Sequence, residues 1–188
     1  DSKGCISPSS AAFLVTVNAL PSAPTAAPTT VCYDGAVHTA DATASTGETV
    51  VWYTANTGGT VTTQPSATSA STITKYALAQ NNSTSCVSAT RTSVSLIINA
   101  LPSAPTAAPT TVCYDGAVHT ADATAGAGET VVWYTANTGG TVTTQPSATS
   151  AGTVTKYALA QNNSTSCVSA TRTSVSLLVN ALPTVSAT

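Results

Sequence analysis

Apolar and polar residues alternate with a period of two along most of the chain, which is the periodicity of β-strands. Residues 48–53, Glu-Thr-Val-Val-Trp-Tyr, place Trp52 on one face of such a strand and Tyr53 on the other. The Asn-Thr-Gly-Gly segment at 56–59 then supplies the residues that a tight hairpin favours. We therefore expect a central β-hairpin that ends at about residue 63, with Trp52 as its largest apolar anchor.

Further short strands are predicted on both sides of this hairpin. Residues 73–80 and 91–98 are strand-like, residues 81–85 form a turn between them, and residues 64–70 form a Pro-containing crossing. One further alternating segment puts small residues on a single face opposite Trp52: Ala36, His38, Ala40, Ala42 and Ala44. About seven short strands with turn signals every 8–12 residues predict an all-β fold, an antiparallel β-sandwich.

The sequence is a tandem repeat. Residues 22–102 and 103–183 are two copies of one unit of 81 residues, and they differ at only six positions. Residues 1–21 match the end of that unit, so we expect them to be the last strand of a preceding repeat, and residues 184–188 to begin a following one. Near-identical copies side by side are typical of an extending array rather than of an enzyme.

Composition excludes several classes of function. Only 12 of the 188 residues are charged and the net charge is −2, so the basic surface of a nucleic-acid-binding protein is absent. No apolar run approaches the length of about 18 residues that a membrane helix needs, so we predict no membrane insertion of this segment. Neither a nucleophile motif nor an acid–base pair is evident, so we predict no catalytic residue, no cofactor and no metal.

Each copy carries two cysteines 54 positions apart, Cys32 with Cys86 and Cys113 with Cys167. No Cys-x-x-Cys or His cluster supports zinc, so the alternatives are disulfides and free buried thiols. Pairing within each copy is the simpler prediction, and it implies an oxidising compartment outside the cytoplasm. Cys5 has no partner in the sequence and is predicted to be unpaired here.

Several motifs of each copy together resemble the CHU-C-associated immunoglobulin-like domain. In the first copy they are Cys32-Tyr33-Asp34-Gly35, Val51-Trp52-Tyr53 with Gly58-Gly59, Thr74-Lys75-Tyr76-Ala77-Leu78-Ala79, Asn82 to Ser88, and Arg91-Thr92. The resemblance covers both copies and the leading strand.

The resemblance implies a seven-stranded immunoglobulin-like sandwich in a bacterial cell-surface filament or adhesin stalk. Domains of this family are found in tandem in very long surface proteins of gliding Bacteroidetes, and those proteins look like type IX secretion cargo. The SprB-type gliding-motility adhesins are the best-known kind. Implied partners are neighbouring repeats of the same chain and the outer-membrane secretion or motility machinery.

The remaining candidate sites are few. Trp52 and Trp133 are predicted core anchors, whereas Tyr53 and Tyr134, on the opposite face, are candidate surface contacts for a sugar. The histidines of the two copies are expected to be structural, and Asp34, Asp41 and Glu48 with their counterparts are too scattered for a calcium loop. We expect Arg91 to be a surface ion partner on the last strand.

Two functions of different classes follow. The first is a non-enzymatic structural role, in which rigid repeats joined by short Pro-rich links extend a surface protein away from the cell. The alternative is a carbohydrate-binding module in which each repeat contacts polysaccharide through Tyr53 or the loop tips. In a further variant, residues 1–18 complete the sheet of a neighbouring chain.

Overall fold

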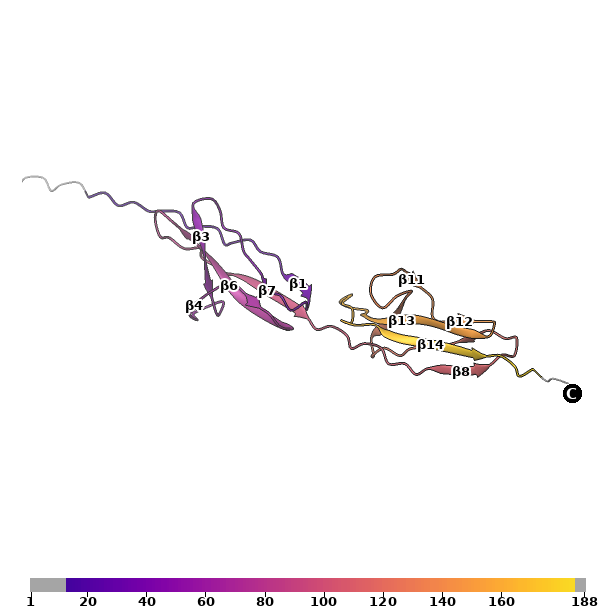
Figure 1. Cartoon of the computed structure of the whole chain (residues 1–188). Coiled ribbons are helices and arrows are strands. Elements are labelled where there is room, and N and C mark those ends of the chain that lie inside the picture. The colour runs from indigo at the N-terminus through magenta and orange to yellow at the C-terminus, as the bar shows by residue number, and fades with distance from the viewer. Residues whose placement is uncertain (1–12, 185–188) are drawn as a thin grey trace, which may run out of the picture. The chain divides into compact units, whose positions relative to one another are not determined.

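The computed structural model describes residues 13–184, and every regular element in this range is a β-strand. Cys5 lies outside the described residues, as do the rest of residues 1–12 and positions 185–188 of the predicted following repeat. The described part of the predicted leading strand, residues 13–21, forms no strand, and its apolar residues Phe13, Leu14 and Val17 are exposed. Figure 1 shows the strands of each copy. The predicted all-β class is confirmed.

The first copy forms a five-stranded and a two-stranded sheet. The larger sheet has the order β1-β7-β6-β3-β4, and the smaller one pairs β2 with β5. The strands are β1 (Thr29–Cys32), β2 (His38–Thr39), β3 (Glu48–Tyr53), β4 (Val61–Thr62), β5 (Ser66–Ala67), β6 (Ser71–Asn81) and β7 (Thr92–Asn99).

The second copy repeats this arrangement. Its sheets have the orders β11-β10-β13-β14-β8 and β12-β9. The strands are β8 (Thr110–Cys113), β9 (His119–Thr120), β10 (Glu129–Tyr134), β11 (Val142–Thr143), β12 (Ser147–Ala148), β13 (Gly152–Asn162) and β14 (Thr173–Asn180). Seven strands in two layers make each copy an immunoglobulin-like sandwich, as predicted.

The first strand of each copy departs from a purely antiparallel arrangement. β1 pairs with β7 in parallel, with Thr29 opposite Leu96 and Cys32 opposite Asn99. β8 pairs with β14 in the same way, whereas the other four pairings of the second copy are antiparallel. The first and last strands of a copy therefore run in the same direction, side by side.

The core lies between the two sheets and is small. In the second copy, Trp133 on β10 packs with buried residues of β13 and β14 and with Ala121, directly after β9. The buried set is Ala121, Trp133, Ala158, Val175, Leu177 and Val179. The indole therefore fills the space that small side chains leave across the sandwich, which is the complementarity of sizes that the alternating alanines predict.

The segment at residues 36–44 is only partly a strand. His38, Ala40, Ala42 and Ala44 are buried or half-buried and alternate with exposed residues, but only His38–Thr39 pairs as a strand, and Ala36 is exposed. The predicted face of small residues is therefore present from His38 to Ala44, but the segment does not pair along its length as a continuous strand. Instead the Ala40 amide donates to the Pro65 carbonyl, and Thr43 bridges to Thr25.

The central hairpin forms at the predicted position. Gly58 and Gly59 have φ values of 62° and 70°, the left-handed region that favours glycine. A Cβ at residue 59 would lie 2.8 Å from Thr54 Oγ1, the atom that accepts the Thr60 amide hydrogen bond. The turn therefore requires glycine for both conformation and space.

Two adjacent leucines of β14 test the core. Leu177 is fully buried whereas Leu178 is 38% exposed. Leu177→Ala is expected to destabilise the second copy by about 2–5 kcal/mol, because it leaves a cavity beside Trp133. Leu178→Ala is the matched control, with an expected cost of about 1 kcal/mol or less. Trp133 fluorescence during guanidinium unfolding, in a Trp52→Phe background, measures both, and equal costs would contradict the described core.

Candidate functional site

One half of the site is the end of the first strand of a copy. Cys32 is the last residue of β1 and lies opposite Asn99, the last residue of β7. The following amide, of Tyr33, donates to the Asn99 carbonyl at 2.9 Å. Hydrogen bonds on both sides therefore fix the backbone that carries Cys32.

The other half is a tight loop after β13. The Asn162 side-chain oxygen accepts the amides of Ser164 and Thr165, both at 3.0 Å. Ser166 then takes a φ of 60°, and the Asn162 amide donates to the Cys167 carbonyl at 2.9 Å. Asn followed by Ser and Thr is typical of such side-chain-capped turns, so the sequence contained a signal for this loop.

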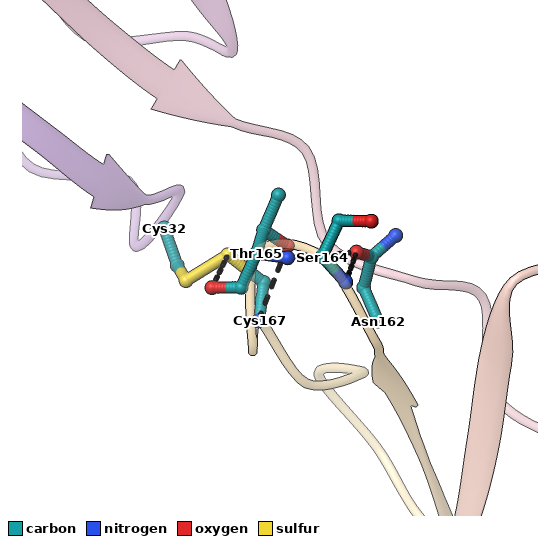
Figure 2. Close-up of a disulfide and its surroundings, with 5 residues drawn as sticks. All are labelled: Cys32, Asn162, Ser164, Thr165 and Cys167. Atoms are coloured by element: carbon teal, nitrogen blue, oxygen red, sulfur yellow. Dashed lines mark hydrogen bonds between the residues drawn. A yellow bond between two sulfur atoms is a disulfide. The ribbon is translucent and has the colours of Figure 1, made fainter.

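A disulfide joins the two halves. Figure 2 shows Cys32 bonded to Cys167 beside the Asn162 loop. Their Cα atoms are 5.6 Å apart, within the usual range for a disulfide. Both residues fall in one compact unit of the chain, which comprises residues 29–39, 66–73 and 96–188. The bond spans a sequence separation of 135 and connects the first copy to the second.

The predicted pairing within each copy is wrong. Cys32 bonds Cys167, and among the described residues Cys86 and Cys113 are free thiols. In the second copy Cys113 lies opposite Asn180, at the end of β14. Cys167 lies beyond the opposite end of that strand, since β13 pairs its Ala158 with Thr173 and continues past it.

The physical reason is distance along the strand. β14 has eight residues, so its two ends are roughly 23 Å apart at about 3.3 Å per residue. A disulfide requires Cα atoms within about 7 Å. The two cysteines of one copy therefore lie too far apart to bond each other.

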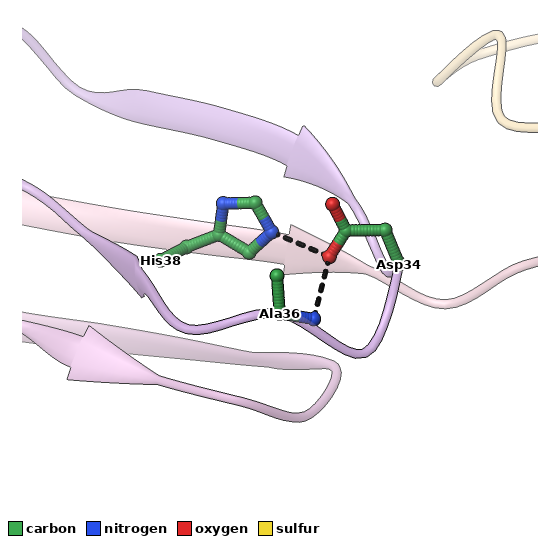
Figure 3. A network of polar contacts seen from close by, with 3 residues as sticks. All are labelled: Asp34, Ala36 and His38. Atoms are coloured by element: carbon green, nitrogen blue, oxygen red, sulfur yellow. Dashed lines mark hydrogen bonds and ion pairs between the residues drawn. The ribbon is translucent and has the colours of Figure 1, made fainter.

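A second cluster is the turn before β2. Asp34 Oδ1 accepts the Ala36 amide at 2.9 Å and lies 2.8 Å from His38 Nε2. Figure 3 shows both contacts converging on this oxygen. The hydrogen bond from the Ala36 amide, which has the larger effect, and the one with His38 lower the pKa of Asp34 below its ordinary value of 3.8. Because the pKa of Asp34 is lower in the folded than in the unfolded chain, the ionised carboxylate stabilises the fold. This stabilisation is complete above about pH 3.8 and is lost as the pH falls through the folded pKa.

Asp115 and His119 repeat this pair at 2.8 Å. Its role in both copies is to hold the turn, as expected for a structural histidine. Among residues 13–184 no group of three potential metal ligands occurs.

The predicted surface tyrosines are already covered on one face. The Arg91 guanidinium carbon lies 3.5 Å from the centre of the Tyr53 ring. Its Nη1 donates to the carbonyls of Ala55 and Gly58 at 2.5 and 2.6 Å. The prediction that Arg91 is a surface ion partner is therefore wrong: Arg91 connects the tyrosine to the hairpin turn, an arrangement that we call the Arg91 clasp. Arg172 repeats it in the second copy, 3.5 Å from the centre of the Tyr134 ring.

A shallow groove lies beside this clasp in each copy. Its volume is about 680 Å³ in the second copy and about 550 Å³ in the first. Polar and apolar surface line each groove about equally; the polar side chains of the second copy's groove include Asn137, Thr138, Thr171 and Arg172. The groove offers hydrogen-bonding groups, whereas one aromatic face that a sugar ring would stack on is occupied by the guanidinium.

The tryptophans are interior residues in both copies. Trp52 and Trp133 are each 8% exposed, so neither is available to a ligand. Within the described part of the chain, no helix is long and apolar enough to cross a membrane.

The family follows from a comparison of the sequence with known domain families. The model described as "Ig-like domain CHU_C associated" matches residues 21–99 and again residues 102–181. The chain belongs to this family. An immunoglobulin-like domain with a disulfide is typical of extracellular or secreted proteins, since the bond requires an oxidising compartment.

Solved structures share only the general architecture. The I67–I69 domains of titin are 14% identical with a TM-score of 0.42, covering 87% of this chain and 67% of that one. Fibronectin(III)-like modules of Clostridium thermocellum CbhA are 17% identical (TM-score 0.38; 86% and 91% covered). Extracellular domains 3–5 of Drosophila OTK are 15% identical (TM-score 0.42; 84% and 60% covered). Among curated proteins none matches significantly.

The disulfide pairing can be tested by peptide mapping. In a Cys5→Ser background, trypsin separates the other four cysteines into peptides 4–75, 76–91, 92–156 and 157–172. Without reduction we expect peptide 4–75 to be linked to 157–172. Links from 4–75 to 76–91 and from 92–156 to 157–172 would instead restore the pairing within each copy.

Proposed function

We propose that this chain is a load-bearing structural segment of a long bacterial cell-surface adhesin or filament, used in attachment or gliding motility. Its role is non-enzymatic. Each copy is a spacer, and a binding region elsewhere in the protein makes the specific contact. The type IX secretion and motility machinery of the outer membrane is its proposed cellular partner, on the strength of the family resemblance.

The disulfide between the copies is the observation that carries this proposal. The bond connects Cys32 to Cys167, so a pull on the two ends of the chain passes through the sulfur atoms. The 134 residues between them lie outside the path of the load. A covalent bypass of this kind limits how far a stalk lengthens under drag.

A second candidate function is binding of polysaccharide. The observation that favours it is the recurrence of the same groove, with its Asn, Thr and Arg side chains, in both copies. Asn, Thr and Arg side chains suit hydroxyl or carboxylate groups of a sugar chain. The guanidinium on Tyr53 disfavours stacking on that face of the ring.

Force spectroscopy tests the structural role. When the chain is pulled from its two ends to full extension, the oxidised form should be shorter than the reduced form by roughly 450 Å, at about 3.4 Å for each bypassed residue. A Cys32→Ser/Cys167→Ser variant should extend to the reduced length under both conditions. A Cys86→Ser/Cys113→Ser variant is the matched control and should keep the difference. Equal lengths of the oxidised and reduced wild type would refute the bypass.

Affinity electrophoresis tests the alternative. If the grooves bind polysaccharide, uronic-acid-containing and neutral polysaccharides in the gel should retard the chain. An Arg91→Lys/Arg172→Lys variant, which keeps the charge but loses the planar fork, should then lose most of that retardation. Unchanged mobility of the wild type in every polysaccharide would remove this candidate and leave the structural role untouched.

A further inference from the structure

The two cysteines of a copy point to partners outside that copy. Cys113 occupies the same position in the second copy as Cys32 in the first, and Cys86 the same position as Cys167. Because they lie at opposite ends of the last strand, each copy presents one cysteine at each end. Cys32 and Cys167 are bonded, whereas Cys86 and Cys113 correspond to the two halves of the same bond and have no bonded partner among residues 13–184.

The free cysteines are already held as their bonded counterparts are. Ser85 has a φ of 58° and Ser166 one of 60°. The Asn81 amide donates to the Cys86 carbonyl at 2.9 Å, as Asn162 does to Cys167.

The strand half of the bond is equally unchanged. The Tyr114 amide donates to the Asn180 carbonyl at 2.8 Å, the counterpart of the bond from Tyr33 to Asn99 at 2.9 Å. The backbone that presents each thiol therefore has the same geometry without the bond as with it.

Exposure differs between the free and the bonded cysteines. Cys113 is exposed whereas Cys32 is half-buried, and Cys86 is half-buried whereas Cys167 is only 1% exposed. Bonding therefore accompanies burial at both positions. An accessible thiol on a rigid backbone is ready to react, and it loses exposed surface once its partner is in place.

We propose that Cys113 bonds the Cys86 position of another copy of this repeat, and that Cys86 bonds the Cys113 position of a further one. Every repeat of an array is then linked to the next by one kind of disulfide, from the end of the first strand to the loop before the last strand. The partner is a second copy of this unit, recognised through its own preformed cysteine loop. The biological use of these bonds rests on the proposed structural role, whereas their chemistry does not depend on it.

The chemistry requires an oxidant, which we take to be a disulfide such as oxidised glutathione or a disulfide oxidoreductase. The Cys113 thiolate attacks the oxidant, forms a mixed disulfide and releases one thiol. The Cys86 thiolate of the second copy then attacks the Cys113 sulfur and releases the other thiol. Two thiols lose two protons and two electrons, and the oxidant is reduced to two thiols.

Two single variants of the whole chain test this pairing. In a Cys5→Ser background, Cys86→Ser leaves only Cys113 free, and Cys113→Ser leaves only Cys86 free. The two proteins, one of them labelled with ¹⁵N, are mixed in equal amounts and equilibrated with reduced and oxidised glutathione. Non-reducing mass spectrometry then compares mixed with like-with-like disulfide dimers.

We expect the mixed dimer in several-fold excess over either like-with-like dimer, with peptide 76–91 of one protein linked to peptide 92–156 of the other. A statistical distribution, or thiols that only form mixed disulfides with glutathione, would overturn the proposal. The Cys32–Cys167 link within each molecule is the internal control for folding. Failure here would leave the length difference under force intact, so the two proposals fail separately.

Discussion

The packing of one indole against alanine side chains holds each copy together. Trp133 lies between the two sheets with Ala121 and Ala158, and Trp52 occupies the same place in the first copy. A buried tryptophan removes roughly 200 Å² from water, which corresponds to about 5 kcal/mol. Because a domain of this size has a total stability of only about 5–15 kcal/mol, this one side chain accounts for a large share of it.

The fold was predictable because its strands carry local signals. The period-two alternation in β3 and the two glycines of the following turn determine a hairpin whatever surrounds them. The near-identical repetition of the sequence, with six differences in 81 positions, then predicts the second copy once the first is known. The Arg91 clasp was not predictable, because the residue is 38 positions from Tyr53 in sequence and no local pattern says which ring a guanidinium will cover.

The disulfide shows where sequence reasoning on repeats fails. Every cysteine recurs after 81 residues, so spacing cannot distinguish a partner in the same copy from one in the next. What decides is the parallel pairing of the first strand, which puts Cys32 level with Asn99 and far from Cys86. That register depends on contacts between residues more than 60 positions apart, and alternation alone does not reveal it.

The parallel pairing of β1 with β7 has a mechanical consequence of its own. A copy pulled by its two ends would drag these strands past each other in opposite directions, so the hydrogen bonds between Thr29–Cys32 and β7 would resist in shear, all together rather than one by one. With the sulfur bridge closed, tension leaves the copy at Cys32 and this ladder is spared. Reduction of the bridge transfers the load to the ladder, so each sandwich contains a second restraint behind the first.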